Sequence, residues 1–203
     1  MEKIVVKTAV KTVLIILAAI LAVFAVFNLA FPQHMATLTE GMGNYSLAVK
    51  YASLRYSYTH DSGDLARCFD DAVLSGNDGY IIKYGEELIN CDKFDEVCES
   101  RNQGANILDY KQRVFGKVAV SYYNTGKKEE AVALAFDANG YNSFAYGNAV
   151  MTLAVAVRAA NDSQYCAKLV SELNKVEPEI EVEQAYIDMV VKSLNGVRYA
   201  SIG

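Results

Sequence analysis

The side chains that could carry out chemistry are few in this sequence. Histidine occurs only at His34 and His60, so a histidine-based metal centre or catalytic triad has little to draw on. The acidic pairs Asp70–Asp71 and Glu86–Glu87 are adjacent in the chain. Adjacent residues on a helix point in different directions, so neither pair converges on one substrate. We therefore predict no catalytic residue, no metal site and no cofactor, and a protein that is not an enzyme.

The four cysteines are the remaining candidates for reactive groups. Cys91 and Cys98 lie across a short predicted turn, so they are close enough in the chain to form a disulfide. Two free thiols are an equally good interpretation, because a domain of this size does not need covalent staples. Cys68 and Cys166 are predicted to be too far apart to pair and to pack as small apolar residues.

Tyrosine is unusually frequent, with fourteen residues in the chain. Its amphipathic side chain suits a binding surface. The alternative is that most tyrosines pack between helices with the hydroxyl group at the edge. Under either interpretation, the positions of the tyrosines depend on the helices that contain them.

The segment from residue 115 to residue 138 contains the clearest helical pattern. Phe115, Val118, Ala119 and Tyr122 recur at spacings of three, four and seven, which places them on one stripe of a helix. Gly126 follows as a turn, and small residues on a second helix allow close approach to the first. The segment therefore predicts a helix-turn-helix unit that needs neighbours to cover its apolar faces.

Similar residues recur one unit before and one unit after this segment. The earlier copy has Ile81, Tyr84, Gly85, Leu88, Phe94 and Val97, and the later one has Val150, Leu153, Ala154, Val157, Cys166, Val170 and Leu173. This pattern resembles a degenerate array of tetratricopeptide repeats, whose period is about 34 residues. The resemblance implies an all-α fold, a right-handed α-solenoid of stacked antiparallel helix pairs.

The chain divides into five segments on this interpretation. Residues 1–11 form a cytoplasmic N-terminal segment and residues 12–31 a transmembrane helix. Residues 32–43 are predicted to be a linker because they contain proline and glycine. Residues 44–196 form the repeat domain, with expected helices at 44–58, 80–91, 95–102, 143–160 and 164–176. Residues 197–203 form a frayed tail.

Residues 12–31 contain no charged side chain, and a helix of that length spans about 30 Å, the thickness of the hydrocarbon core. A cleavable signal peptide is the alternative, but the apolar stretch is long and lacks a small-x-small cleavage site. Lys3, Lys7 and Lys11 precede the span, and the next basic residue is Lys50. The positive-inside rule therefore predicts a single-pass protein with a cytoplasmic N-terminus and an extracytoplasmic C-terminal domain.

The part of the chain after the span has 16 basic and 23 acidic residues, a net charge of −7. Such a charge argues against nucleic acid as a partner. The lipid bilayer is an expected partner through the N-terminal helix alone.

The resemblance implies a scaffold or adaptor that binds a protein or peptide partner on the concave side formed by the first helices. The candidate groove contains Ile89, Asn90, Val120, Tyr123, Asn124, Met151 and Arg158, with Tyr122 pointing inward. Arg113 and Asn148, together with Asn124 and Arg158, approximate the cluster with which some members of this family bind a C-terminal carboxylate. Two alternatives stay open: a cell-envelope enzyme with unrecognised carboxylate chemistry, and a structural subunit of a membrane complex.

Overall fold

The structure is a computed structural model of the whole chain, and it describes residues 2–102, 109–137, 148–177 and 181–196. Within these ranges the secondary structure consists of helices without strands, as the sequence predicts. The helices are α1 (Glu2–Ala30), α2 (Pro32–Gly41), α3 (Tyr45–Thr59), α4 (Ser62–Ser75), α5 (Asp78–Ile89), α6 (Phe94–Asn102), α7 (Tyr110–Asn124), α8 (Lys128–Ala135), α9 (Ala149–Ala159), α10 (Ser163–Leu173) and α11 (Glu181–Leu194).

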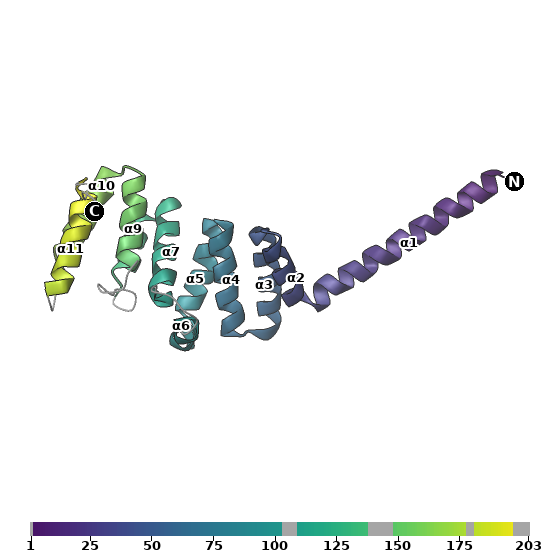
Figure 1. Cartoon of the computed structure of the whole chain (residues 1–203), viewed down its shortest axis with the longest axis horizontal. Coiled ribbons are helices and arrows are strands. Elements are labelled where there is room, and N and C mark those ends of the chain that lie inside the picture. The colour runs from purple at the N-terminus through teal and green to yellow at the C-terminus, as the bar shows by residue number, and fades with distance from the viewer. Residues whose placement is uncertain (1, 103–108, 138–147, 178–180, 197–203) are drawn as a thin grey trace, which may run out of the picture.

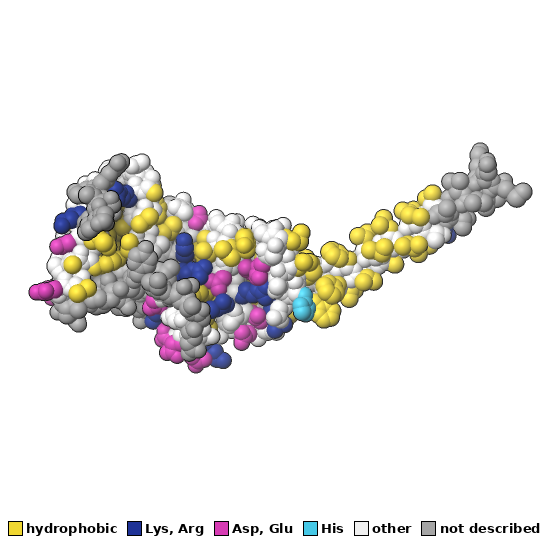
Figure 2. All heavy atoms as spheres, in the orientation of Figure 1, with side chains coloured by type: hydrophobic (Ala, Val, Ile, Leu, Met, Phe, Trp, Pro, Cys, Tyr) yellow, Lys and Arg dark blue, Asp and Glu magenta, His cyan; other side chains and the backbone are white. Residues whose placement is uncertain are grey.

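Helix α1 projects from one end of a row formed by the other helices (Figure 1). Its segment Val10–Ala30 is exposed throughout and has a mean hydropathy of 2.9, so its length and composition allow it to cross a membrane. Signal sequences near an N-terminus have the same features. Figure 2 shows apolar side chains along the described part of this helix on the face in view.

Residues 32–41 are helix α2, whereas the sequence analysis predicted a linker over residues 32–43. Pro32 occupies the first turn, where its missing N–H is not needed. Met35, Ala36 and Thr39 are buried where α2 packs against α3. Proline and glycine therefore mark the two ends of a helix here, and the residues between them are held by tertiary packing.

The observed helix bounds follow local sequence signals closely. Asn44, Asp61, Asn77, Asp109, Asn148 and Asp162 each accept a hydrogen bond from the backbone at the start of the next helix. Gly126 has a φ of +87° in the predicted turn between α7 and α8, a conformation that favours glycine. The start that the sequence analysis gave to α9, near residue 143, lies outside the described residues, and Asn148 is the cap observed.

The row contains two groups of parallel helices. The first group is α3 and α5, and the second is α7, α9 and α11. In the second group, Gln112 near the start of α7 accepts a hydrogen bond from the amide of Ala149 at the start of α9. Arg158 near the end of α9 reaches Ser193 near the end of α11. Helices α7, α9 and α11 are therefore parallel. In the first group, Tyr56 near the end of α3 donates to Glu87 near the end of α5, so these helices are also parallel.

The two groups meet between α5 and α7, which are antiparallel. Asn124 at the end of α7 lies 3.2 Å from Asp78 at the start of α5. Lys111 at the start of α7 lies 3.0 Å from Asp95 in the first turn of α6, the helix that follows α5 in the chain. The short helix α6 packs mainly on α7 and α4, not on α5. The prediction that residues 80–91 and 95–102 pack on each other as one repeat therefore differs from the structure.

Candidate binding groove

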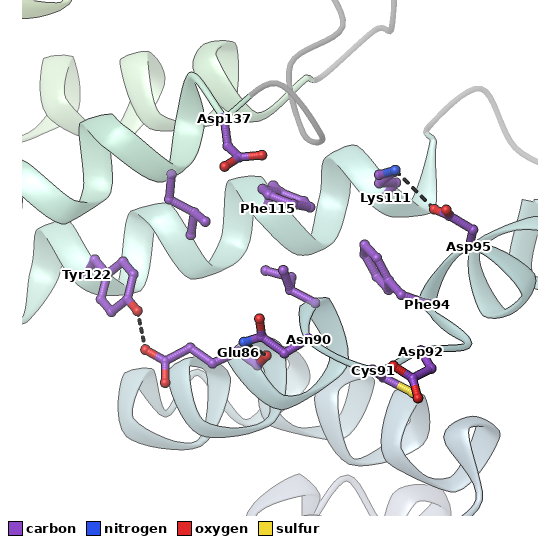
Figure 3. A pocket seen from close by; sticks show the side chains of 12 residues that line it. Glu86, Asn90, Cys91, Asp92, Phe94, Asp95, Lys111, Phe115, Tyr122 and Asp137 are labelled. Atoms are coloured by element: carbon purple, nitrogen blue, oxygen red, sulfur yellow. Dashed lines mark hydrogen bonds and ion pairs between the residues drawn. The ribbon is translucent and has the colours of Figure 1, made fainter.

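The antiparallel junction leaves an open cavity of about 560 Å³ between α5, α6, α7 and α8. Figure 3 shows it from close by, with α7 along one wall and the end of α5 along the other. The side chains that line it are Glu86, Ile89, Asn90, Cys91, Asp92, Phe94, Asp95, Lys111, Phe115, Tyr122, Leu134 and Asp137. We call this cavity the α5–α8 groove.

Apolar side chains form the floor of the α5–α8 groove. The rings of Phe94 and Phe115 are buried, and their centroids lie 6.1 Å apart. Ile89 and Leu134 are half-buried beside them. The floor is therefore built from four different helices, α5, α6, α7 and α8, so it exists only when the helices have packed.

Acidic side chains surround this floor. Glu86, Asp92, Asp95 and Asp137 contribute four carboxylates, and Lys111 contributes the one ammonium group in the lining. The Lys111 ammonium pairs with Asp95 at 3.0 Å, and it lies 5.8 Å from the centre of the Phe94 ring. The lining therefore has a net negative charge over an apolar surface.

Tyr122 fixes the position of one of these carboxylates. Its hydroxyl group donates a hydrogen bond to Glu86, which joins α7 to α5 across the groove (Figure 3). Burial, and then this hydrogen bond, raise the pKa of Tyr122 to about 12. The tyrosine is therefore a neutral donor near pH 7, and one Glu86 oxygen is directed by the protein itself.

Two of the predicted groove residues line this cavity, namely Ile89 and Asn90. The others lie on different faces or at the opposite ends of their helices. Val120 and Met151 are half-buried on α7 and α9. Arg113, at the start of α7, lies 3.7 Å from Asp70 of α4. The predicted single concave surface is therefore not formed by these residues.

The orientations predicted for Tyr122 and Tyr123 are wrong. Tyr123 is buried, with 8% of its surface exposed, and donates a hydrogen bond to Asp162 at 2.9 Å. Tyr122 is half-buried and faces the α5–α8 groove. Helix α7 has two buried faces because α5 and α9 pack on different sides of it, so one apolar stripe does not define its interior.

Three of the polar residues predicted for the groove, Asn124, Asn148 and Arg158, have structural partners. Asn148 is fully buried, caps α9 through the amide of Met151 at 2.8 Å, and accepts a hydrogen bond from Tyr186. Asn124 is exposed and contacts Asp78, and Arg158 is exposed and contacts Ser193. The prediction for Asn148 is wrong, because a buried capping residue offers no free amide to a partner.

All four cysteines are free thiols in the structure, so Cys91 and Cys98 are not joined by a disulfide. Cys98 is buried on α6, and burial raises its pKa to about 12. Burial has the same effect on Cys68. Thiols with raised pKa values are poor nucleophiles. Among the described residues, no three His, Cys, Asp or Glu side chains are grouped so that they could hold a metal ion.

A second open groove, of about 730 Å³, lies between α3 and α5. Tyr51, Tyr56 and Tyr84 line it together with Lys50 and Lys83. Tyr56 donates a hydrogen bond to Glu87 at 2.7 Å, which raises its pKa to about 12. Three of the fourteen tyrosines therefore line one open groove, which contains none of the predicted groove residues.

Sequence reasoning missed most of the α5–α8 groove. Phe94 and Phe115 are large apolar residues, which predicts that they are buried but does not distinguish a groove from any other part of the core. Three charged groove residues lie near helix ends and belong to no recognisable sequence pattern, namely Lys111, Asp95 and Asp137. Their common location depends on the reversal of direction between α5 and α7, which local sequence does not report.

No protein-family model matches this chain, and comparisons with curated proteins and with solved structures found no significant match.

Proposed function

We propose that this protein is a membrane-tethered helical-repeat module that binds a segment of another protein in the α5–α8 groove. The observation that carries this proposal is the composition of the groove, an apolar floor surrounded by carboxylates. The partner segment carries a lysine or arginine side chain. The domain faces the extracytoplasmic side, and α1 anchors it in the bilayer.

The groove suits a basic, partly apolar segment for physical reasons. The aliphatic stem of a lysine or arginine packs on apolar surface while its charged end reaches a carboxylate. The half-buried Ile89 and Leu134 supply such a surface above the buried rings of Phe94 and Phe115. Glu86 is already directed by Tyr122. Opposite charges steer the encounter and exclude acidic segments. The open shape of the cavity allows an extended chain to enter it.

The spacing of side-chain contacts supports the repeat interpretation for α7 to α11. Tyr165 bonds to Glu129, 36 residues earlier, and Arg158 bonds to Ser193, 35 residues later. Tetratricopeptide units recur after about 34 residues, so contacts between equivalent positions of neighbouring units have this spacing. A tetratricopeptide-like α-solenoid therefore remains our proposal for this part, with α6 as the departure that opens the groove.

A change of charge in the groove tests the proposed partner. We expect Asp92→Lys to weaken binding of basic peptides about tenfold or more, because a lysine replaces an attractive charge with a repulsive one. Binding is measured with the full chain in lipid nanodiscs and labelled peptides that alternate basic and apolar residues. Added salt should weaken the wild-type binding.

Glu99→Lys is the matched control, since Glu99 is exposed on α6 and does not line the groove. It changes the net charge by the same amount and should leave binding within about twofold. In cells, a photoreactive residue at Asn90 should capture a partner that the same residue at Glu99 does not. Equal loss of peptide binding in both charge-reversal variants would contradict the groove assignment.

The orientation is tested on intact cells. We expect protease added outside the cells to digest the domain and to leave the first thirty or so residues, because the lysines at positions 3, 7 and 11 hold the N-terminus in the cytoplasm. Fragments are detected with tags at either end of the chain. Full protection of the domain would show that the orientation is the opposite of the one proposed. A mature N-terminus near Phe31 would show that the segment is a cleaved signal peptide.

A further inference from the structure

An apolar surface is exposed along α2 and the two residues that flank it, Phe31 and Met42. Phe31, Leu38 and Met42 are 48%, 55% and 74% exposed. Their spacings of seven and four residues place them on one side of the helix. The buried residues of α2, which pack on α3, occupy a neighbouring side. We call the exposed set the α2 stripe.

The α2 stripe is continuous with the surface of α1. Only Phe31 separates the two helices, and its ring lies 5.1 Å from that of Phe27 at the end of α1. Figure 2 shows apolar side chains continuing from α1 onto the adjoining end of the helix row. The chain turns sharply between α1 and α2 (Figure 1), so α2 does not extend the path of α1 through a bilayer.

Polar contacts fix the domain against the end of α1. Tyr51 of α3 donates a hydrogen bond to the side-chain oxygen of Asn28. The amide group of Asn28 in turn donates to the carbonyl of Phe24 at 2.6 Å. This arrangement holds α3, and with it α2, close to the last turn of α1.

The length of the apolar part of α1 places α2 at a defined depth. The segment Val10–Ala30 has 21 residues, which extend about 31 Å and so match the hydrocarbon core. Residue 31 then lies where hydrocarbon gives way to headgroups. An amphipathic helix at that boundary inserts its apolar side about 5–10 Å into the lipid.

We infer that α2 lies on the outer surface of the bilayer and that the α2 stripe is covered by lipid. This inference rests on the membrane anchorage included in the proposed function. It gives the domain a fixed orientation, with the row of helices held at the membrane by two contacts, the span and the stripe. The lipid that covers the stripe needs no particular headgroup, because the three side chains are apolar.

The chain contains no tryptophan, so single tryptophan substitutions report local depth without interference. Full chains carrying Leu38→Trp or Ile20→Trp are reconstituted in phosphatidylcholine vesicles with bromine near either end of the acyl chains. We expect Leu38→Trp to lose fluorescence mainly to bromine near the headgroups. Ile20→Trp, in the middle of the span, should lose it mainly to bromine near the methyl end.

Gln33→Trp is the matched control on α2, because Gln33 is exposed outside the stripe. Val155→Trp on α9, where the native residue is 61% exposed, is the control far from the membrane. We expect less quenching at position 33 than at position 38 and none at position 155.

The quenching measurements distinguish failure of the lipid contact of α2 from failure of the membrane anchor. Quenching of Ile20→Trp without quenching of Leu38→Trp would overturn the lipid contact of α2 and leave the membrane anchor intact. Absence of quenching at both positions would overturn the anchor itself. A blue-shifted Leu38→Trp emission that resists bromine and disappears on dilution into excess lipid would assign the stripe to a second copy of the chain.

Discussion

Replacing Gly85 by leucine is expected to lower the free energy of unfolding by about 3 kcal/mol, the upper range for overpacking a core. A Cβ atom at Gly85 would lie 2.2 Å from the Val118 side chain of α7 and 3.2 Å from the Phe69 ring of α4. Val118 and Phe69 are fully buried and have little room to move. Leucine therefore forces α5 away from its neighbours, which is measured by urea unfolding of the full chain in detergent.

The smaller substitution Gly85→Ala separates two opposing effects. Alanine stabilises a helix by about 1 kcal/mol relative to glycine, so a net loss would show that the clash exceeds the gain in helix propensity. Val118→Ala should reduce the loss caused by Gly85→Ala, because it removes the side chain that the new Cβ would meet. Gly79→Ala on the same helix should cost little, since Gly79 is exposed.

A stabilising effect of Gly85→Ala, with no coupling to Val118→Ala, would contradict the close contact between α5 and α7. The same contact forms one wall of the α5–α8 groove. We therefore expect Gly85→Leu to abolish peptide binding as well. Loss of peptide binding without loss of stability would show that the groove can be altered without disturbing the packing of α5 against α7.

Asp71→Asn is expected to stabilise the protein, by about 1–3 kcal/mol at pH 8, the usual cost of an unsatisfied buried polar group. Asp71 of α4 is 3% exposed, and its Oδ2 atom has no hydrogen-bond partner. Burial and the neighbouring Glu40 carboxylate of α2 raise the pKa of Asp71 to about 7, although the Arg67 guanidinium opposes this shift. Arg67 itself pairs with Glu40 at 2.7 Å.

The direction of the pH dependence follows from this raised pKa. In the unfolded chain Asp71 releases its proton near its ordinary pKa of 3.8, whereas the folded chain keeps the proton until about pH 7. The unfolded state is therefore increasingly favoured between about pH 4 and pH 7. The contribution of Asp71 to stability is lost over that range and stays constant above it.

Thermal unfolding of the full chain between pH 4 and pH 8 tests this prediction. The gain from Asp71→Asn should be largest at pH 8 and should shrink toward pH 4, where the native aspartate is also neutral. Asp92→Asn is the control, because Asp92 is exposed and its neutralisation should change stability little at either pH. A gain that is equal at both ends of the range would show that Asp71 is ionised throughout in the folded protein.

The sequence by itself determined the helices and most of their limits. Apolar spacing and turn residues predicted the bounds of α3, α5 and α6 to within a few residues, because these signals act within one or two helical turns. The apolar helix at the N-terminus was equally clear, since length and the absence of charge are enough to identify a candidate membrane span. Helix α2 was missed, and a linker was predicted in its place, because proline and glycine are also found at the ends of a short helix.

Only the tertiary structure decided how the helices face one another. Successive residues on a helix point about 100° apart, so the choice between Tyr122 and Tyr123 as the inward residue needs the positions of α5 and α9. The antiparallel contact of α5 with α7 brings Asp78 to Asn124 and Asp95 to Lys111. Contacts between such distant residues depend on the whole packing, and so the α5–α8 groove and the proximity of Asp71 to Glu40 became visible only in the folded chain.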